Sequence, residues 1–354
     1  MNKARVYNIF LFLSTFTRSL VEVFSLVLLY QKGYTINDIF FFLTIMYLTG
    51  IIVSKLALSI SSKLVLIISS IIYGLSYIYL FYVNKSIISL SILATLLGLG
   101  TYSYHIIRHY LALELLDDKK RRPNKIILIT YLGTIFSSLI GMLLIDKLPR
   151  HITCIIIFIM SFISIFPVLK LPQERLISSK NTYLVHIPTS KLIFSILEQA
   201  KVIFLELQPL FLYAYINKSI YYVGIFNIIT NIASLIVVYI LSTKLKKDNF
   251  KYYTIILGLI LILKLNIKSG LVLLLIALLE GIFIKIYETF SLDNLYSHDN
   301  TPIIPYLYTE ELIFFTTKTI IMFIFCFFNL NLYIIMYFNI VILVLSGFFI
   351  KKEK

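Results

Sequence analysis

Charged side chains stand inside stretches of this sequence that are otherwise apolar. Arg18 and Glu22 lie four residues apart within IFLFLSTFTRSLVEVFSLVLLY, a stretch long enough to span a bilayer. An ionised side chain at bilayer depth costs roughly 2.5–3.5 kcal/mol on insertion scales, so such groups are usually paired, turned inward and functional. The pair therefore predicts a chain that moves something polar through itself.

The same anomaly recurs four more times along the chain. The further groups are His105, Arg108 and His109; Glu198, Lys201 and Glu206; Glu280, Lys285 and Glu288; and Glu310, Glu311 and Lys318. From these groups and the first pair we take the candidate substrate and proton-coupling residues to be Glu22, Arg18, His105, Arg108, Glu206, Glu280, Lys201, Lys285 and Glu288. We expect no catalytic residue, no cofactor and no metal ligand.

Arg18 and Glu22 share one face of a helix, because residues four apart are neighbours there. One interpretation is an internal ion pair that neutralises itself and fixes helix packing. The other, which we favour, is that both face a central cavity, where Glu22 titrates or binds a cationic group and Arg18 tunes it.

His105, Arg108 and His109 also share one helix face. Histidines four residues apart can chelate a metal, but no acidic residue accompanies them at a fitting spacing in the sequence, so a metal site is not expected. A proton relay, a contact with a substrate anion, or an Arg108 that snorkels to the membrane interface all remain open.

Two carboxylates lack a local partner. Lys201 pairs with Glu198 and Lys285 with Glu288 at three-residue spacing, whereas Glu206 and Glu280 are left alone. An unpaired carboxylate in an apolar setting can load and release a proton near neutral pH, so these two are the best coupling candidates after Glu22. Either could instead be protonated and hydrogen-bonded in a helix interface.

Glu310 and Glu311 are expected to open a helix, where acids suit the helix dipole, with Lys318 two turns further along. Adjacent acids at membrane depth also suggest an intramembrane protease. The run EELIFFTTK offers none of the Arg, His or Asn partners that such an enzyme needs.

Composition places the chain in a membrane. Hydrophobic residues make up 59% of its 354 residues, charged residues 14%, and the mean hydropathy is +0.93. A soluble domain carries about 25% charged residues, so we predict an integral membrane protein with little mass outside the bilayer. The net charge of +15 comes from basic residues in short loops, which indicates topology and not a nucleic-acid partner.

A span needs about 20 apolar residues, and helices are the expected spanning element because lipid offers the backbone no hydrogen bonds. On this basis we predict twelve spans, centred near residues 18, 46, 72, 98, 134, 160, 204, 230, 258, 280, 316 and 340. Placing both termini in the cytoplasm puts most of the 32 Lys and Arg residues in inner segments, as the positive-inside rule requires.

The chain divides near its middle. The polar stretch 171–189 reads as a cytoplasmic linker between a six-helix bundle at 1–170 and another at 190–354. The halves look related at an offset of 184, which aligns Thr35 with Ser219, each capping the next helix, and Glu22 with Glu206. A similar alignment places His105 opposite Glu288.

Two six-helix halves joined by a central loop resemble the major facilitator superfamily, over essentially the whole chain at the level of topology. The motifs are degenerate: SKLALSISSKL stands where the family has a Gly- and Asp-containing loop, and only Gly133 and Gly141 remain of its fifth-helix motif. The resemblance implies a midplane site between the halves, lined by spans one, four, seven and ten. Four of the five charged spans are those four.

We therefore predict a secondary active transporter that works by alternating access and is coupled to protons. It would export a small organic or amphipathic compound across the cytoplasmic membrane, as a monomer with both termini inside. The alternatives are a permease subunit that works with a separate ATPase, and a membrane-embedded enzyme or scaffold.

Overall fold

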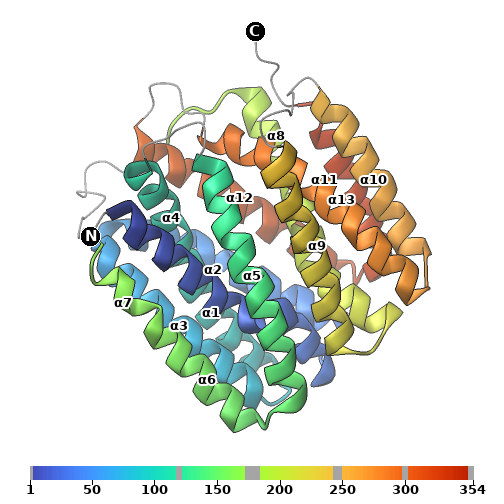
Figure 1. Cartoon of the computed structure of the whole chain (residues 1–354), viewed down its shortest axis with the longest axis horizontal. Helices are drawn as coiled ribbons and strands as arrows, with labels where there is room; N and C mark the ends of the chain where they lie inside the picture. Colours follow the sequence, from blue (N-terminus) through green and yellow to red (C-terminus); the bar gives the residue numbers. More distant parts are fainter. Residues whose placement is uncertain (1–2, 117–121, 172–183, 242–248, 297–301, 350–354) are drawn as a thin grey trace.

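The structure is a computed structural model that describes residues 3–116, 122–171, 184–241, 249–296 and 302–349. Its regular elements are all helical (Figure 1). The first half of the chain contains α1 (Lys3–Gln31), α2 (Ile36–Ser59), α3 (Ser62–Tyr82), α4 (Ile87–Leu115), α5 (Arg122–Lys147), α6 (Arg150–Ile163) and α7 (Ile165–Val168). The second half contains α8 (Thr189–Phe211), the π-helical η1 (Leu212–Ile216), α9 (Ile220–Leu241), α10 (Phe250–Asn266), α11 (Gly270–Tyr296), α12 (Ile303–Phe327) and α13 (Leu332–Ser346).

Each of the twelve predicted span centres falls inside a helix of the structure. The sixth span is α6 continued by the short α7, and the seventh is α8 continued by η1. Among the described residues, eight helices are long and apolar enough to cross a membrane by length and composition. The predicted fold class, an all-α polytopic membrane protein with a major facilitator-like arrangement of helices, is confirmed.

The first hairpin between helices shows how local sequence sets a helix start. Gly33 adopts φ +86°, a conformation that glycine tolerates and that reverses the chain after α1. Thr35 then caps α2: its side chain accepts the backbone N–H of Asp38, and the Asp38 carboxylate accepts the backbone N–H of Thr35 at 2.8 Å. In the second half, the hydroxyl of Ser219 accepts the N–H of Tyr222 at 3.3 Å before α9, as the predicted alignment of these two turns requires.

The short connections between helices, of two to four residues each, lie on one face of the bundle. The connection at 60–61 is the exception. We call the face with the short connections the hairpin face, and we call the opposite face, where α1 begins and α13 ends, the terminal face. The predicted linker, 171–189, lies largely outside the described residues, since 172–183 are not described, so the predicted domain boundaries stay a prediction.

The two halves meet along two pairs of helices. Helix α2 packs against α12, and α5 packs against α9; Figure 1 shows α5 and α9 side by side. Within each half, α1 packs on α5 and α4 on α2 and α3, while α9 packs on α11 and α8 on α13. Helices α3, α6, α10 and α13 lie away from the contact between the halves. The space between the halves is therefore bordered by α1, α2, α4 and α5 of the first half and by α8, α9, α11 and α12 of the second.

Two glycines let helices of one half approach closely. A Cβ added at Gly141 of α5 would lie 2.1 Å from the carbonyl oxygen of Leu20 in α1, and one added at Gly281 of α11 would lie 2.1 Å from that of Thr230 in α9. Small residues at such crossings allow the backbones to touch, which is how helices associate in lipid. Gly141 is thus explained by packing.

Replacing Gly141 by Ala should destabilise the first half, because the new methyl group must push α1 and α5 apart. We expect the free energy of unfolding in detergent micelles to fall by about 1–3 kcal/mol, the usual cost of overpacking. Gly270→Ala is the matched control, since its nearest neighbour, Tyr222, lies 3.5 Å from the added Cβ. Equal melting temperatures for the two variants would contradict this account of the α1–α5 contact.

Candidate functional site

A cavity of about 600 Å³ lies between the two halves. Among the described residues it is lined by α1, α2, α4 and α5 from the first half and by α8, η1, α9, α11 and α12 from the second. The sequence predicted that spans one, four, seven and ten line the cavity. The structure adds α2, α5, α9 and α12, the four helices along which the halves meet. Ser195, His109 and Asn294 line the cavity toward the terminal face, and Leu26, Leu212 and Val223 line it toward the hairpin face.

At the hairpin face the two halves contact each other directly. The side-chain amide of Gln31 donates to the hydroxyl of Tyr213 at 2.9 Å, and the rings of Tyr30 and Tyr213 lie 6.4 Å apart between centroids. Between α2 and α12, the rings of Phe40 and Phe325 lie 6.0 Å apart. This conformation is therefore closed at the hairpin face, and its polar cavity extends from the middle of the bundle toward the terminal face.

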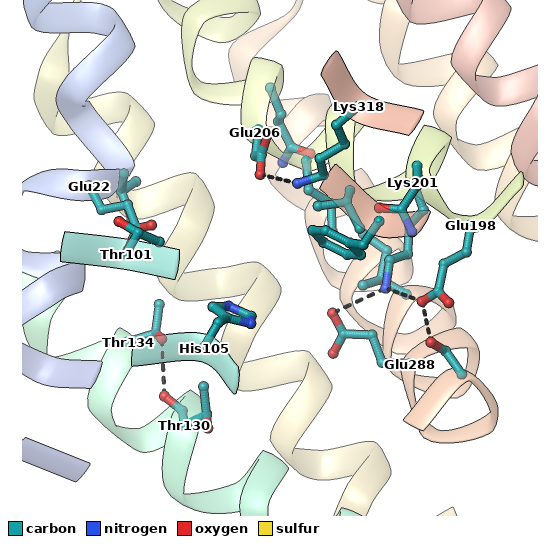
Figure 2. Close-up of a pocket in the computed structure, with 18 of the residues that line it drawn as sticks. Glu22, Thr101, His105, Thr130, Thr134, Glu198, Lys201, Glu206, Glu288 and Lys318 are labelled. Atoms are coloured by element: carbon teal, nitrogen blue, oxygen red, sulfur yellow. Dashed lines mark hydrogen bonds and ion pairs between the residues drawn. The ribbon is translucent and has the colours of Figure 1, made fainter. Parts of the chain in front are cut away.

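Glu22 lines this cavity from the middle of α1. Its side chain is exposed although the residues on either side of it along α1 are buried or half-buried, because it faces the empty space between the halves. Figure 2 shows Glu22, Thr101 and His105 on one side of the cavity, and Glu206, Lys201 and Glu288 on the other. No described basic side chain lies within ion-pairing distance of the Glu22 carboxylate.

Arg18 does not line the cavity, contrary to the expectation that it shares this surface with Glu22. It is only 7% exposed and points into the first half, where its guanidinium donates to Ser69 Oγ at 2.7 Å and to the Gly100 carbonyl at 3.1 Å. The rings of Tyr73 and Tyr104 lie 4.3 and 3.9 Å from its Cζ. Cation–π contacts and hydrogen bonds stabilise the buried charge, so Arg18 joins α1 to α3 and α4.

Glu206 lines the cavity but is paired, although no basic residue stands at pairing distance from it along its own helix. The ammonium group of Lys318 in α12 lies 2.7 Å from its Oε1 and is also held over the rings of Tyr47 and Phe314, at 4.6 and 4.4 Å. Its other oxygen, Oε2, is buried without a hydrogen-bond partner. The partner comes from another helix, which is why spacing along the chain did not indicate it.

Glu288 of α11 lies at the centre of a network that joins the halves. Its Oε2 accepts a hydrogen bond from the hydroxyl of Tyr131 in α5 at 2.6 Å, and Lys201 of α8 lies 3.8 Å from its Oε1. Lys201 also lies 3.7 Å from Glu198, as the sequence predicted. The bond from Tyr131 to Glu288 links the first half to the second, so moving the halves apart at this level would break it.

Lys285 lies behind this network. It is fully buried, does not line the cavity, and lies 3.5 Å from Glu288 Oε2, the partner predicted from its spacing. Its ammonium group also lies 4.6 Å from the centre of the Tyr131 ring. It stabilises the Glu288 carboxylate from inside the second half.

Glu280 is not an unpaired carboxylate near the cavity, and the sequence-based expectation for it was wrong. It is 0% exposed, and both its oxygens lie 2.9 Å from the ammonium group of Lys264 in α10, which is 0% exposed as well. The rings of Phe204 and Phe226 lie 5.1 and 4.8 Å from that ammonium group. The pair is sealed within the second half, away from the cavity lining.

His105, Arg108 and His109 of α4 line the cavity together, and α12 adds an acid to them. Glu311 Oε1 lies 3.8 Å from His105 Nδ1, and Arg108 Nη2 lies 3.2 Å from His109 Nε2. Because α12 begins at Ile303, Glu311 and its neighbour Glu310 lie in its interior and do not open the helix as predicted. The acidic residue that the sequence did not supply near the histidines thus comes from the other half of the chain.

Several lining residues carried no signal in the sequence. Uncharged polar side chains on α5, α8 and α9 are common in membrane helices and have no distinctive spacing. Those that line the cavity are Thr130, Tyr131, Thr134, Ser195, Gln199, Gln208, Asn227, Thr230 and Asn231. Of these, Asn227 donates to Ser138 Oγ across the α5–α9 contact at 2.7 Å, so it also joins the halves.

Comparison with known proteins finds a likeness in fold alone. No family model matches the chain, and no curated protein matches it. Among solved structures, it is similar to the crystal structure of a bacterial homologue of the iron transporter ferroportin in its outward-facing state, with a TM-score of 0.64 and 13% sequence identity. The likeness covers 97% of this chain and 98% of the other.

The fold and the cavity together define the class of protein. The chain is an integral, multi-pass membrane protein with a fold of the major facilitator type, and its polar cavity lies between the two halves. Membership of the superfamily itself stays a prediction, since the likeness lies in the fold. The predicted duplication also stays a prediction, although the four ionisable residues that it aligns, Glu22 with Glu206 and His105 with Glu288, line the cavity.

The sealed pair in the second half yields a test of stability. Glu280→Gln leaves the Lys264 charge buried without its partner, so the free energy of unfolding in detergent micelles should fall by about 3–5 kcal/mol. The double variant Lys264→Met/Glu280→Leu removes both charges and should be close to the wild type, because a buried ion pair contributes little net stability over apolar packing. If the double variant were as unstable as Glu280→Gln, the ion pair would contribute more to the free energy of unfolding than the cancelling of its own two charges.

Proposed function

We propose that this protein is a proton-coupled secondary transporter that works by alternating access and exports a small amphipathic organic compound bearing positive charge. The observation that carries the proposal is Glu22, a carboxylate that faces the cavity between the two halves and that pairs with no basic side chain among the described residues. A carboxylate in that position can be neutralised by a proton or by a cationic substrate, but not by both at once. Competition of this kind couples the two movements in opposite directions.

The balance of charge around the cavity supports a cationic substrate. Its described lining contains six carboxylates, Glu22, Glu198, Glu206, Glu288, Glu310 and Glu311, against the three fixed positive charges Arg108, Lys201 and Lys318. Ion pairs account for Glu198, Glu206 and Glu288. The acidic surplus attracts positive charge, and the enclosing low-dielectric walls focus that attraction.

The apolar part of the lining supports an amphipathic compound. Toward the hairpin face, the cavity is walled by Leu26, Phe42, Leu212, Val223 and Phe226. Binding sites for organic molecules combine such apolar walls with a few placed polar groups. A substrate with an apolar body next to Glu206 and Glu22 would use both surfaces.

The contacts between the halves support alternating access. The hairpin face is closed by Gln31, Tyr30 and Tyr213, whereas the bond from Tyr131 to Glu288 joins α5 to α11 beside the cavity. With the termini in the cytoplasm, as the distribution of basic residues predicts, this conformation is open to the inside. Rocking of one half against the other would break the first set of contacts and open the cavity to the outside.

The structural neighbour is named as a homologue of an iron transporter, but its likeness to this chain lies in the fold alone, so its cargo is not transferred. Location in the cytoplasmic membrane, a monomeric state and export are parts of the same proposal. A permease subunit with a separate ATPase and a membrane enzyme or scaffold remain the alternatives that transport by the isolated chain would exclude.

Reconstituted vesicles test proton coupling directly. An imposed pH gradient should drive the wild-type chain, with no ATP present, to accumulate at least one member of a panel of amphipathic organic cations. Glu22→Gln should lose this accumulation to the level of protein-free vesicles, because the amide cannot exchange a proton. Its substrate counterflow at equal pH should weaken as well, because the amide cannot neutralise the positive charge of the substrate.

Glu114→Gln is the matched control for this experiment. Glu114 is an exposed carboxylate of α4 that does not line the cavity, so its variant should behave like the wild type. Gradient-driven accumulation that survives in Glu22→Gln would remove Glu22 from the coupling step. The absence of gradient-driven flux of every compound through the wild-type chain would refute proton coupling itself.

A further inference from the structure

A second cluster in the cavity has donor atoms suited to a metal ion. His105 and His109 lie one turn apart on α4, and Glu311 approaches them from α12 in the other half. One ligand atom from each of the three lies within 4.8 Å of the other two. We propose that these three residues bind a divalent first-row transition-metal ion, a role that does not depend on which compound the transporter carries.

The distances are close to those that a shared ion requires. His105 Nδ1 and Glu311 Oε1 are 3.8 Å apart, and two ligands that each lie about 2.1 Å from one ion can be separated by up to about 4.2 Å. All three ligand atoms lie within 4.8 Å of one another, so the widest separation exceeds that limit by at most about 0.6 Å, a gap of the size that side-chain rotations can close.

The donor types select the class of ion. Imidazole nitrogen suits Zn²⁺, Fe²⁺, Co²⁺ and related ions, and two histidines with one carboxylate leave further positions for water. Mg²⁺ and Ca²⁺ prefer oxygen ligands and should bind poorly here. The three residues all line the cavity, so an ion and its water ligands can reach them from the open side.

Arg108 is the neighbour that opposes binding. Its Nη2 lies 3.2 Å from His109 Nε2, so in the neutral imidazole this nitrogen accepts a hydrogen bond from the guanidinium. The guanidinium charge repels an incoming cation, and an ion that bound this nitrogen would need the same lone pair. Arg108 beside His109 therefore opposes binding, while the acidic surplus of the cavity lining favours it.

Because the ligands come from α4 and α12, a bound ion would join the two halves. Metal binding therefore stabilises the conformation described here over any conformation in which α4 and α12 separate. This consequence distinguishes the cluster from the Lys264–Glu280 pair, which lies within one half. It also makes metal binding measurable as protection of the folded chain.

Titration of the purified full-length chain in detergent with Co²⁺ tests the proposal, since the visible absorption of Co²⁺ reports its ligands. The wild type should show saturable absorption bands, be competed by Zn²⁺ but not by Mg²⁺, and melt at a higher temperature with Zn²⁺ present. His105→Ala and the isosteric Glu311→Gln should each weaken binding by at least about ten-fold, because even outer-shell changes cost 10–100-fold in metal affinity. Arg108→Gln should tighten binding, since it removes the competitor for His109.

His151→Ala is the matched control, because His151 is an exposed residue of α6 far from the cavity lining, and it should bind Co²⁺ like the wild type. A wild type without saturable Co²⁺ or Zn²⁺ binding would overturn the proposal, and so would unchanged affinity in both ligand variants. Weaker binding in Arg108→Gln would overturn it too, because affinity would then follow general damage to the cavity. None of these outcomes bears on the vesicle experiment with Glu22, so the two proposals can fail separately.

Discussion

Neutralising ionised side chains within the bilayer is the constraint on which the arrangement of these helices depends. Each such group needs an opposite charge, hydrogen-bonding and aromatic partners, or water, and the structure supplies these in different places. Away from the cavity, Lys264 and Glu280 neutralise each other, and Arg18 is held by hydrogen bonds and aromatic rings. Facing the cavity, Glu22 is in contact with solvent-accessible space. The same chemistry thus serves stability in one setting and binding in the other.

Polar and ionisable side chains also join the two halves to each other. The α2–α12 and α5–α9 contacts hold the two halves together along the sides of the cavity. Polar side chains then bridge the space between them: Tyr131 reaches Glu288, and His105 approaches Glu311. Bonds of this kind can be broken and re-formed without exposing apolar surface to water. Gly141 and Gly281, by contrast, lie at close helix crossings within the halves.

Much of the fold could be predicted from the sequence, because hydrophobic length and turn chemistry are local properties. Twelve apolar segments set the helices, and eight helices among the described residues are long and apolar enough to cross a membrane. Thr35 and Ser219, with the turns before them, set where two of the helices begin. The lack of hydrogen-bonding partners in lipid leaves helices as the available form for such segments. Even the cavity residues Glu22, Lys201 and Glu288 could be identified, since a charge in an apolar run is visible without a structure.

What the tertiary structure decided is which charges meet. Glu280 and Glu206 look equally unpaired along the chain, yet Lys264 seals the first inside one half and Lys318 holds the second at the cavity. The acid that completes the pair of histidines on α4 lies about two hundred residues away, at Glu311. Helical spacing identifies partners only within three or four residues, because further along the chain proximity depends on how helices cross. The sequence by itself therefore determined that ionisable groups enter the membrane, and the packing of the two halves determined which of them neutralise each other and which face the cavity.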